Sequence, residues 1–309
     1  MANRGIYLVA NEASSRLCNN LVFSVRSSGC RLPIRVIPYG GAGVRFQQHY
    51  PDVAVVELSH FPRPALSFLE QLEQGLPGCS SGLLRRFLAW FGEFDEFLYS
   101  DNDIVATMNW TELFDYLGES DLVHADEEYK TGGRFNFARP IEIQRQFGEA
   151  ALEQAITAGH FVCRKSPKHV SDFLAALDWF QLNPTIPKWH DQALLHVAVL
   201  LGKWKIHNLC KPPHSWSSSW AGDYSNTLAI IHAIQSGRTP ISHIHYSGRN
   251  PSGTESVDEL LFSSLGCKQR QRLQLFALLR ELTGLQLANK YVAKITRRFA
   301  QLSPRTRRM

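Results

Sequence analysis

The sequence predicts an α/β fold with a mostly parallel central sheet flanked by helices. From the N-terminus onward, short apolar segments of strand length alternate with longer segments of helical periodicity. One strand-like segment, residues 96–100, stops directly at two carboxylates, and open α/β sheets bind ligands at that edge. With 309 residues, 44% of them hydrophobic and 20% charged, the chain can bury a large core.

The N-terminal segments predict the parallel arrangement. Residues 5–10 indicate a buried strand, and residues 11–28 place aliphatic side chains on one face of a helix. Residues 33–37 and 53–58 are expected to be the next strands, at a spacing typical of parallel strands joined by crossover helices. The glycines within residues 40–43 lack the GxGxxG spacing, so they favour a turn over a phosphate cradle.

The following segments extend the same pattern. Residues 83–90 predict a crossover helix that leads into the strand 96–100. Residues 126–139 are polar and contain glycine, which favours a loop over the site, and residues 211–224 predict an irregular aromatic loop. The remaining expected elements are strands at residues 121–125, 161–163 and 203–209, and a helix at residues 191–201.

Composition narrows the class of protein. No apolar run approaches the roughly 20 residues that span a bilayer, and residues 6–10 are too short for the core of a signal peptide. The six cysteines are scattered without a CxxC pair, so neither a disulfide framework nor a zinc site is indicated. A cytoplasmic location is therefore expected.

Charge separates the C-terminus from the rest of the chain. Residues 268–309 carry eleven Lys or Arg against one acid, although the whole chain has a net charge of only +5. We expect two parts, a catalytic domain at residues 1–262 and a basic amphipathic helical tail at residues 263–309. The tail either contacts anionic lipid on the inner face of a membrane or packs on the domain with its basic face in water. No aromatic-interleaved motif supports a nucleic-acid partner.

The two carboxylates after the strand 96–100 are Asp101 and Asp103. Two acids one residue apart can share a divalent cation, and oxygen ligands suit Mn²⁺ or Mg²⁺. Such an ion neutralises the phosphates of a nucleotide diphosphate and stabilises charge on the departing group. Asp pairs also cap turns, and the preceding apolar strand is what favours a metal site here.

Residues 97–103, Phe-Leu-Tyr-Ser-Asp-Asn-Asp, resemble the DxD strand end of GT-A glycosyltransferases, especially the glycogenin-like and lipopolysaccharide galactosyltransferase-like families. The resemblance covers roughly residues 5–252, because three further segments follow in the family order: residues 159–164, residues 190–192 and residues 245–248. It implies a GT-A fold and transfer of a sugar from a nucleotide-diphosphate donor, with UDP-sugar expected. The implied acceptor is a saccharide, lipid or protein.

The resemblance also implies roles for individual residues. His245 of the HxxG match would complete the metal site as a neutral third ligand, unless it is an ordinary core histidine. These families usually continue to Lys-Pro-Trp, whereas this chain continues with Arg249 after Gly248, so Arg249 is the candidate phosphate contact. Either Arg85 or the neighbouring Arg86 would face the donor. The remaining donor-site candidates are Ala10, Asn11 and Glu12 at the end of the first strand, Asn102, Gly159 and Gly248.

Asp191 is the candidate catalytic carboxylate, because it begins a helix and matches the family's Asp-Gln pair with Gln192. It would be the general base of an inverting enzyme, or would position the acceptor in a retaining one; an ordinary helix cap is the alternative. Gln192 is a candidate acceptor contact. Trp216 and Trp220 either form a platform for an acceptor sugar or anchor their loop.

Two other functions compete with glycosyl transfer. A sugar-phosphate nucleotidyltransferase shares this sheet and metal use, but it needs a glycine-rich basic segment after the first strand, and residues 11–16 contain no glycine. A non-catalytic, glycosyltransferase-like scaffold is the second alternative. The presence of all four candidate metal and catalytic side chains argues against it; these are Asp101, Asp103, His245 and Asp191.

Overall fold

The computed structural model describes residues 2–40, 44, 50–127, 131–153, 155–188, 190–225 and 227–247. The chain divides into two units, Met1–Arg249 and Asn250–Met309, and every described residue belongs to the first. The basic tail and the predicted boundary at residue 262 therefore lie outside the described residues. Gly41 and Gly43 of the glycine-rich turn do so as well.

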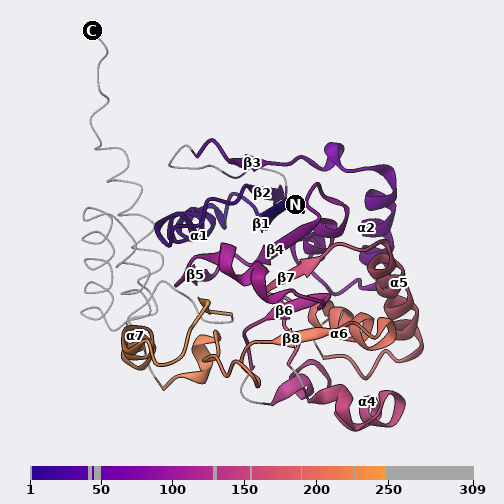
Figure 1. Ribbon diagram of the computed structural model, residues 1–309. Coiled ribbons are helices and arrows are strands. Elements are labelled where there is room, and N and C mark those ends of the chain that lie inside the picture. Colours follow the sequence, from indigo (N-terminus) through magenta and orange to yellow (C-terminus); the bar gives the residue numbers. More distant parts are fainter. Residues whose placement is uncertain are drawn as a thin grey trace, which may run out of the picture. The chain divides into compact units, whose positions relative to one another are not determined.

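A seven-stranded sheet forms the centre of this unit, with the strand order β3-β2-β1-β4-β7-β6-β8 (Figure 1). The pairs β1–β2, β2–β3, β1–β4 and β6–β8 are parallel, whereas β7 runs antiparallel to both β4 and β6. The predicted mostly parallel sheet is confirmed. Its strands are β1 (Arg4–Ala10), β2 (Ile34–Pro38), β3 (Val53–Val55), β4 (Glu96–Ser100), β6 (Leu122–His124), β7 (His160–Arg164) and β8 (Ile206–Asn208).

A second, two-stranded sheet pairs β5 (Ile104–Ala106) with β9 (His243–His245) in antiparallel fashion. The chain enters β5 directly after the turn at residues 101–103, so the two sheets share that turn as their junction. The sequence pattern did not predict this small sheet, because three-residue strands are too short to show alternation.

Helices cover both faces of the large sheet. The α-helices are α1 (Ser15–Ser27), α2 (Arg63–Gly75), α3 (Ser81–Leu84), α4 (Pro140–Phe147), α5 (Pro167–Leu182), α6 (His190–Gly202) and α7 (Thr227–Ser236). Short 3₁₀ helices are η1 (Leu58–His60), η2 (Arg85–Phe91), η3 (Trp110–Tyr116), η4 (Gly132–Asn136), η5 (Glu149–Leu152) and η6 (Ala221–Asp223).

The alternation of side chains along β1 divides the core into two layers. Tyr7 and Val9 point into a layer built with α2, α5 and α6, whereas Ile6 and Leu8 point into a layer built with α1. Because both faces of the strand are covered, its sequence is continuously apolar rather than alternating. This explains why the first strand could be predicted from composition alone.

Several predicted elements differ in length from those observed. The strand expected at residues 53–58 ends at Val55, and the chain then turns into η1. The crossover helix expected at residues 83–90 is a single turn, α3, continued as the 3₁₀ helix η2. The loop expected at residues 126–139 contains the short 3₁₀ helix η4.

Candidate active site

The small sheet places His245 of β9 next to the turn at residues 101–103. Ile104 of β5 pairs with His245 of β9, and the backbone N–H of Tyr246 donates to the carbonyl of Asp103 at 2.9 Å. This register places the His245 side chain beside the Asp103 carboxylate. Two segments far apart in the sequence are thereby joined at one site.

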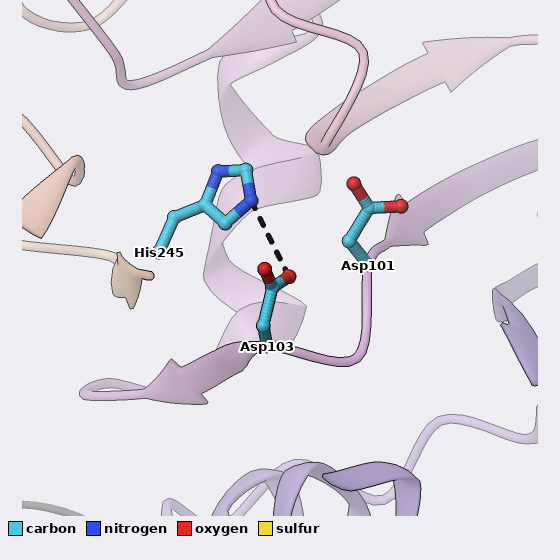
Figure 2. A group of neighbouring side chains, drawn as sticks. All are labelled: Asp101, Asp103 and His245. Atoms are coloured by element: carbon cyan, nitrogen blue, oxygen red, sulfur yellow. Dashed lines mark ion pairs between the residues drawn. The ribbon is translucent and has the colours of Figure 1, made fainter. Parts of the chain in front are cut away.

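Asp101, Asp103 and His245 point toward one another (Figure 2), and each offers one ligand atom such that these atoms lie within 4.8 Å of one another. Nε2 of His245 is 3.4 Å from Oδ1 of Asp103. This buried nitrogen makes no hydrogen bond of good geometry among the described residues. Two carboxylates and an imidazole with a spare nitrogen fit a divalent cation.

The charges of the three side chains are coupled. Burial raises the pKa of Asp101, and the opposing charge of Arg86 offsets this only in part. Burial also disfavours the charged form of Asp103, but the close contact with His245 outweighs it, so the pKa of Asp103 is lowered. For His245, burial is likewise outweighed, here by the contact with Asp103, and its pKa rises to about 9.

Gly159 lies against the imidazole of His245. A Cβ atom at this position would be 2.3 Å from Cε1 of His245, so only glycine leaves room for the ring. The carbonyl of Gly159 also accepts a hydrogen bond from the backbone N–H of Asp101 at 2.7 Å. Gly159, which directly precedes β7, therefore contacts two of the three candidate ligands.

Arg86, rather than Arg85, is the arginine of the site. Nη2 of Arg86 lies 3.3 Å from Oδ1 of Asp101 and 3.3 Å from Oδ2 of Asp191, and Nη1 donates to the carbonyl of Ala158 at 2.6 Å. Burial alone would lower the pKa of Arg86, but the charge of Asp101, followed by Tyr99 and Asp191, raises it. The guanidinium thus stays charged and links the candidate catalytic carboxylate to the candidate metal site. Arg85 donates instead to the carbonyl of Pro38.

Tyr99 adds a further contact to Asp101. Its hydroxyl donates to Oδ1 of Asp101 at 2.7 Å, and the guanidinium of Arg86 lies 5.1 Å from the centre of its ring. Burial raises the pKa of Tyr99 well above its usual value, so the phenol remains a hydrogen-bond donor. Nothing in the sequence pattern pointed to this role for Tyr99, since a tyrosine in a buried strand is an ordinary core residue.

A cavity of about 290 Å³ lies beside these residues, between the end of β1, the turn at residues 101–103 and the segment from Ser80 to Arg86. Asn102 lines it together with both aspartates. The amide of Asn102 donates to the carbonyl of Val9 at 2.6 Å, which ties the turn to β1. Its Oδ1 is buried without a hydrogen-bond partner among the described residues.

The predicted residues at the end of β1 have local roles as well. Oδ1 of Asn11 accepts the backbone N–H of Ser14 at 2.9 Å, and the N–H of Asn11 donates to Oγ of Ser14 at 2.9 Å, so this pair shapes the entry into α1. Ala10 is buried, and its carbonyl accepts the N–H of Tyr39. Glu12 is exposed. It is Val9 of β1 that lines the cavity.

Gln192 joins a network that the sequence did not reveal. Its Nε2 donates to Oδ1 of Asn136 at 2.6 Å, and its Oε1 accepts the N–H of Ala158 at 3.5 Å. Nδ2 of Asn136 lies 3.0 Å from Nδ1 of His196, which is one helical turn beyond Gln192. The candidate acceptor residue is therefore held to the same segment, residues 156–159, that contacts Arg86 and His245.

Trp216 and Trp220 anchor their loop. Only 6% of Trp216 and 7% of Trp220 is exposed. The Trp216 ring packs against Tyr116 with 5.2 Å between ring centres, and the backbone of Trp220 forms a β-bridge with His245. Neither ring presents an open face to an acceptor in this structure. Gly248 and Arg249 lie outside the described residues.

Comparison with solved structures supports the same fold. The chain is similar to the bifunctional glycosyltransferase WbbM in its apo form, with a TM-score of 0.60, 12% sequence identity, and coverage of 90% of this chain and 52% of that one. It is also similar to the galactosyltransferase LgtC in complex with donor and acceptor sugar analogues, with a TM-score of 0.52, 15% identity, and coverage of 86% and 99%. The glycosyltransferase GlyE of Streptococcus pneumoniae TIGR4 gives a TM-score of 0.51, 15% identity, and coverage of 95% and 64%.

These similarities show that the chain has the GT-A-type glycosyltransferase fold that its motifs predicted. The chain spans about half the length of WbbM and about two thirds of GlyE. No protein-family model and no curated protein sequence matches it. Within the described part of the chain, the helices are too short or too polar to cross a membrane.

Proposed function

We propose that the protein is a metal-dependent glycosyltransferase that transfers a sugar from a nucleotide-diphosphate donor, with a UDP-sugar expected. The observation that carries the proposal is the convergence of Asp101, Asp103 and His245 beside a 290 Å³ cavity in a GT-A-type fold. The names of the similar structures describe glycosyl transfer, which supports this choice. The acceptor class, saccharide, lipid or protein, stays open.

Asp101, Asp103 and His245 would hold Mn²⁺ or Mg²⁺, which when bound supplies positive charge to the donor diphosphate. The cavity would take the nucleotide, with Asn102 offering its unpaired Oδ1 to a donor group of the ligand. Gly248 and Arg249 remain candidate phosphate contacts from the sequence alone. The tail at residues 268–309 remains a candidate for peripheral contact with an anionic membrane.

Asp191 is the proposed catalytic carboxylate. Its side chain is 13% exposed and is held 3.3 Å from Arg86, which also contacts Asp101. The contact fixes Asp191 close to the candidate metal site and keeps a cation beside it. We therefore favour Asp191 as the residue that acts on the acceptor, as the general base of an inverting enzyme or as the residue that positions the acceptor in a retaining one.

The test is the thermal midpoint of the purified full chain with a panel of nucleotide diphosphates, each with and without Mn²⁺. A ligand that binds only the folded state stabilises that state by about 2.7 kcal/mol when its free concentration is 100 times its Kd. We expect a rise for one nucleotide that requires Mn²⁺ and is lost in Asp103→Ala. Asp95→Ala, an acid just before β4 outside the site, is the matched control. No rise with any nucleotide would favour the non-catalytic scaffold instead.

A further inference from the structure

Tyr99 lies one residue before the end of β4, and Asp101 directly follows that strand. The Tyr99 hydroxyl therefore reaches along the strand to Asp101, where it donates to Oδ1 at 2.7 Å. Arg86 contacts the same oxygen at 3.3 Å. Both of these contacts fall on Oδ1, and Oδ2 has no hydrogen bond or ion pair among the described residues.

The Tyr99 ring is itself fixed. It is 1% exposed and stacks on Phe161 of the neighbouring strand β7, with 5.6 Å between ring centres and 28° between ring planes. The register of β4 and β7 pairs these two residues directly. A phenol fixed in this way holds its hydrogen-bond partner in one orientation.

We propose that Tyr99 is a positioning residue for the metal site: it holds the Asp101 carboxylate through Oδ1 and leaves Oδ2 to a divalent cation. The inference rests on the proposed metal-dependent function. Ligating carboxylates are commonly oriented by hydrogen bonds from residues that do not touch the ion, and loss of such a partner weakens metal binding by roughly 10-fold to 100-fold. Tyr99 itself would not contact the ion.

The chain offers a matched control for the hydroxyl. Tyr7 of β1 pairs with Tyr99 across the β1–β4 ladder and is equally buried, at 1% exposure. Its hydroxyl lies against Gly92 and not at the metal site: a Cβ added to Gly92 would be 1.8 Å from this hydroxyl. Tyr7→Phe thus removes the same atom from the same sheet without touching Asp101.

The experiment titrates Mn²⁺ into wild type, Tyr99→Phe and Tyr7→Phe, with and without UDP, and follows free Mn²⁺ by electron paramagnetic resonance. Thermal midpoints show that both variants fold. We expect Tyr99→Phe to bind Mn²⁺ roughly tenfold or more weakly than wild type, and Tyr7→Phe to bind as wild type does.

Equal Mn²⁺ affinity in all three proteins would overturn the inference while leaving the metal site intact. If Tyr7→Phe weakens binding as much as Tyr99→Phe, the effect is one of general packing and the inference is also overturned. If wild type binds no Mn²⁺ in either condition, the proposed metal site fails and the inference fails with it. The wild-type titration therefore separates the two failures.

Discussion

At the scale of single residues, Gly159 controls the space available to His245. A methyl group on its Cα would come within 2.3 Å of the imidazole, and its own backbone is tied to Asp101. A side chain as small as alanine must therefore move the ring or the strand. The proposed metal site is sensitive to the smallest substitution possible.

We predict that Gly159→Ala weakens Mn²⁺ binding by roughly tenfold or more, because it displaces the imidazole from the two aspartates. It should also lower the thermal midpoint, since overpacking of a buried position costs about 1–3 kcal/mol. Isothermal titration with Mn²⁺ and a thermal melt measure both effects.

A double-mutant cycle supplies the control. The three atoms nearest to a Cβ at Gly159 all belong to the His245 ring, so in a His245→Ala background Gly159→Ala should cost less stability. An equal loss of stability in both backgrounds would show that the clash is with another part of the protein.

The site residues differ in how readily the sequence revealed them. Asp101 and Asp103 are visible because a strand of apolar residues ends at them, and His245 is visible through its spacing to Gly248. Tyr99 and Asn136 are not visible, since a tyrosine in an apolar strand and an asparagine in a loop have many ordinary roles. Only the fold shows that their side chains reach Asp101 and Gln192.

At the scale of elements, strands were predicted more completely than helices. β1 and β4 are buried on both faces, and the resulting continuous apolar segments stand out. The helices α2 and α5 were not predicted, although α5 is among the largest contributors to the core. In α5 apolar side chains lie on more than one face, so the single stripe that marks an amphipathic helix is weak.

The start of α5 is nevertheless encoded in the sequence. Ser166 precedes Pro167 at the first helical position, and its Oγ accepts the N–H of Lys168. We predict that Ser166→Ala lowers the free energy of unfolding by about 1 kcal/mol. Urea unfolding measures this, and the exposed Ser171→Ala within the same helix should not lower the midpoint, because Ala has the higher helix propensity.

At the scale of the whole molecule, buried histidines link stability to pH. Burial lowers the pKa of His124 to about 3, with the charges of His196 and His207 contributing, and burial lowers the pKa of His196 to about 4. Burial also lowers the pKa of His160 and His243 well below the usual value. In the unfolded chain these side chains titrate near 6.5.

At these four positions the folded state therefore binds fewer protons than the unfolded chain below about pH 6.5. We predict that, below that pH, the free energy of unfolding falls on acidification by roughly 1.4 kcal/mol per pH unit for each of these four histidines until its folded pKa is reached. Urea unfolding at a series of pH values between 7 and about 4.5 measures the slope.

His124→Leu tests one contribution, because neither ring nitrogen of His124 has a hydrogen-bond partner of good geometry among the described residues. The variant should lose roughly 1.4 kcal/mol per pH unit of that slope. A slope identical to that of wild type would mean that His124 is already protonated or exposed in the folded protein.

The pairing of β5 with β9 also has a consequence for the order in which the protein matures during synthesis. During translation Asp101 and Asp103 are synthesised before β6, β7 and β8. His245 is synthesised only after every strand of the large sheet. A nascent chain that stops short of β9 carries both carboxylates and no imidazole. The proposed metal site would therefore be complete only after β9 has paired with β5, once every strand of the large sheet has been synthesised.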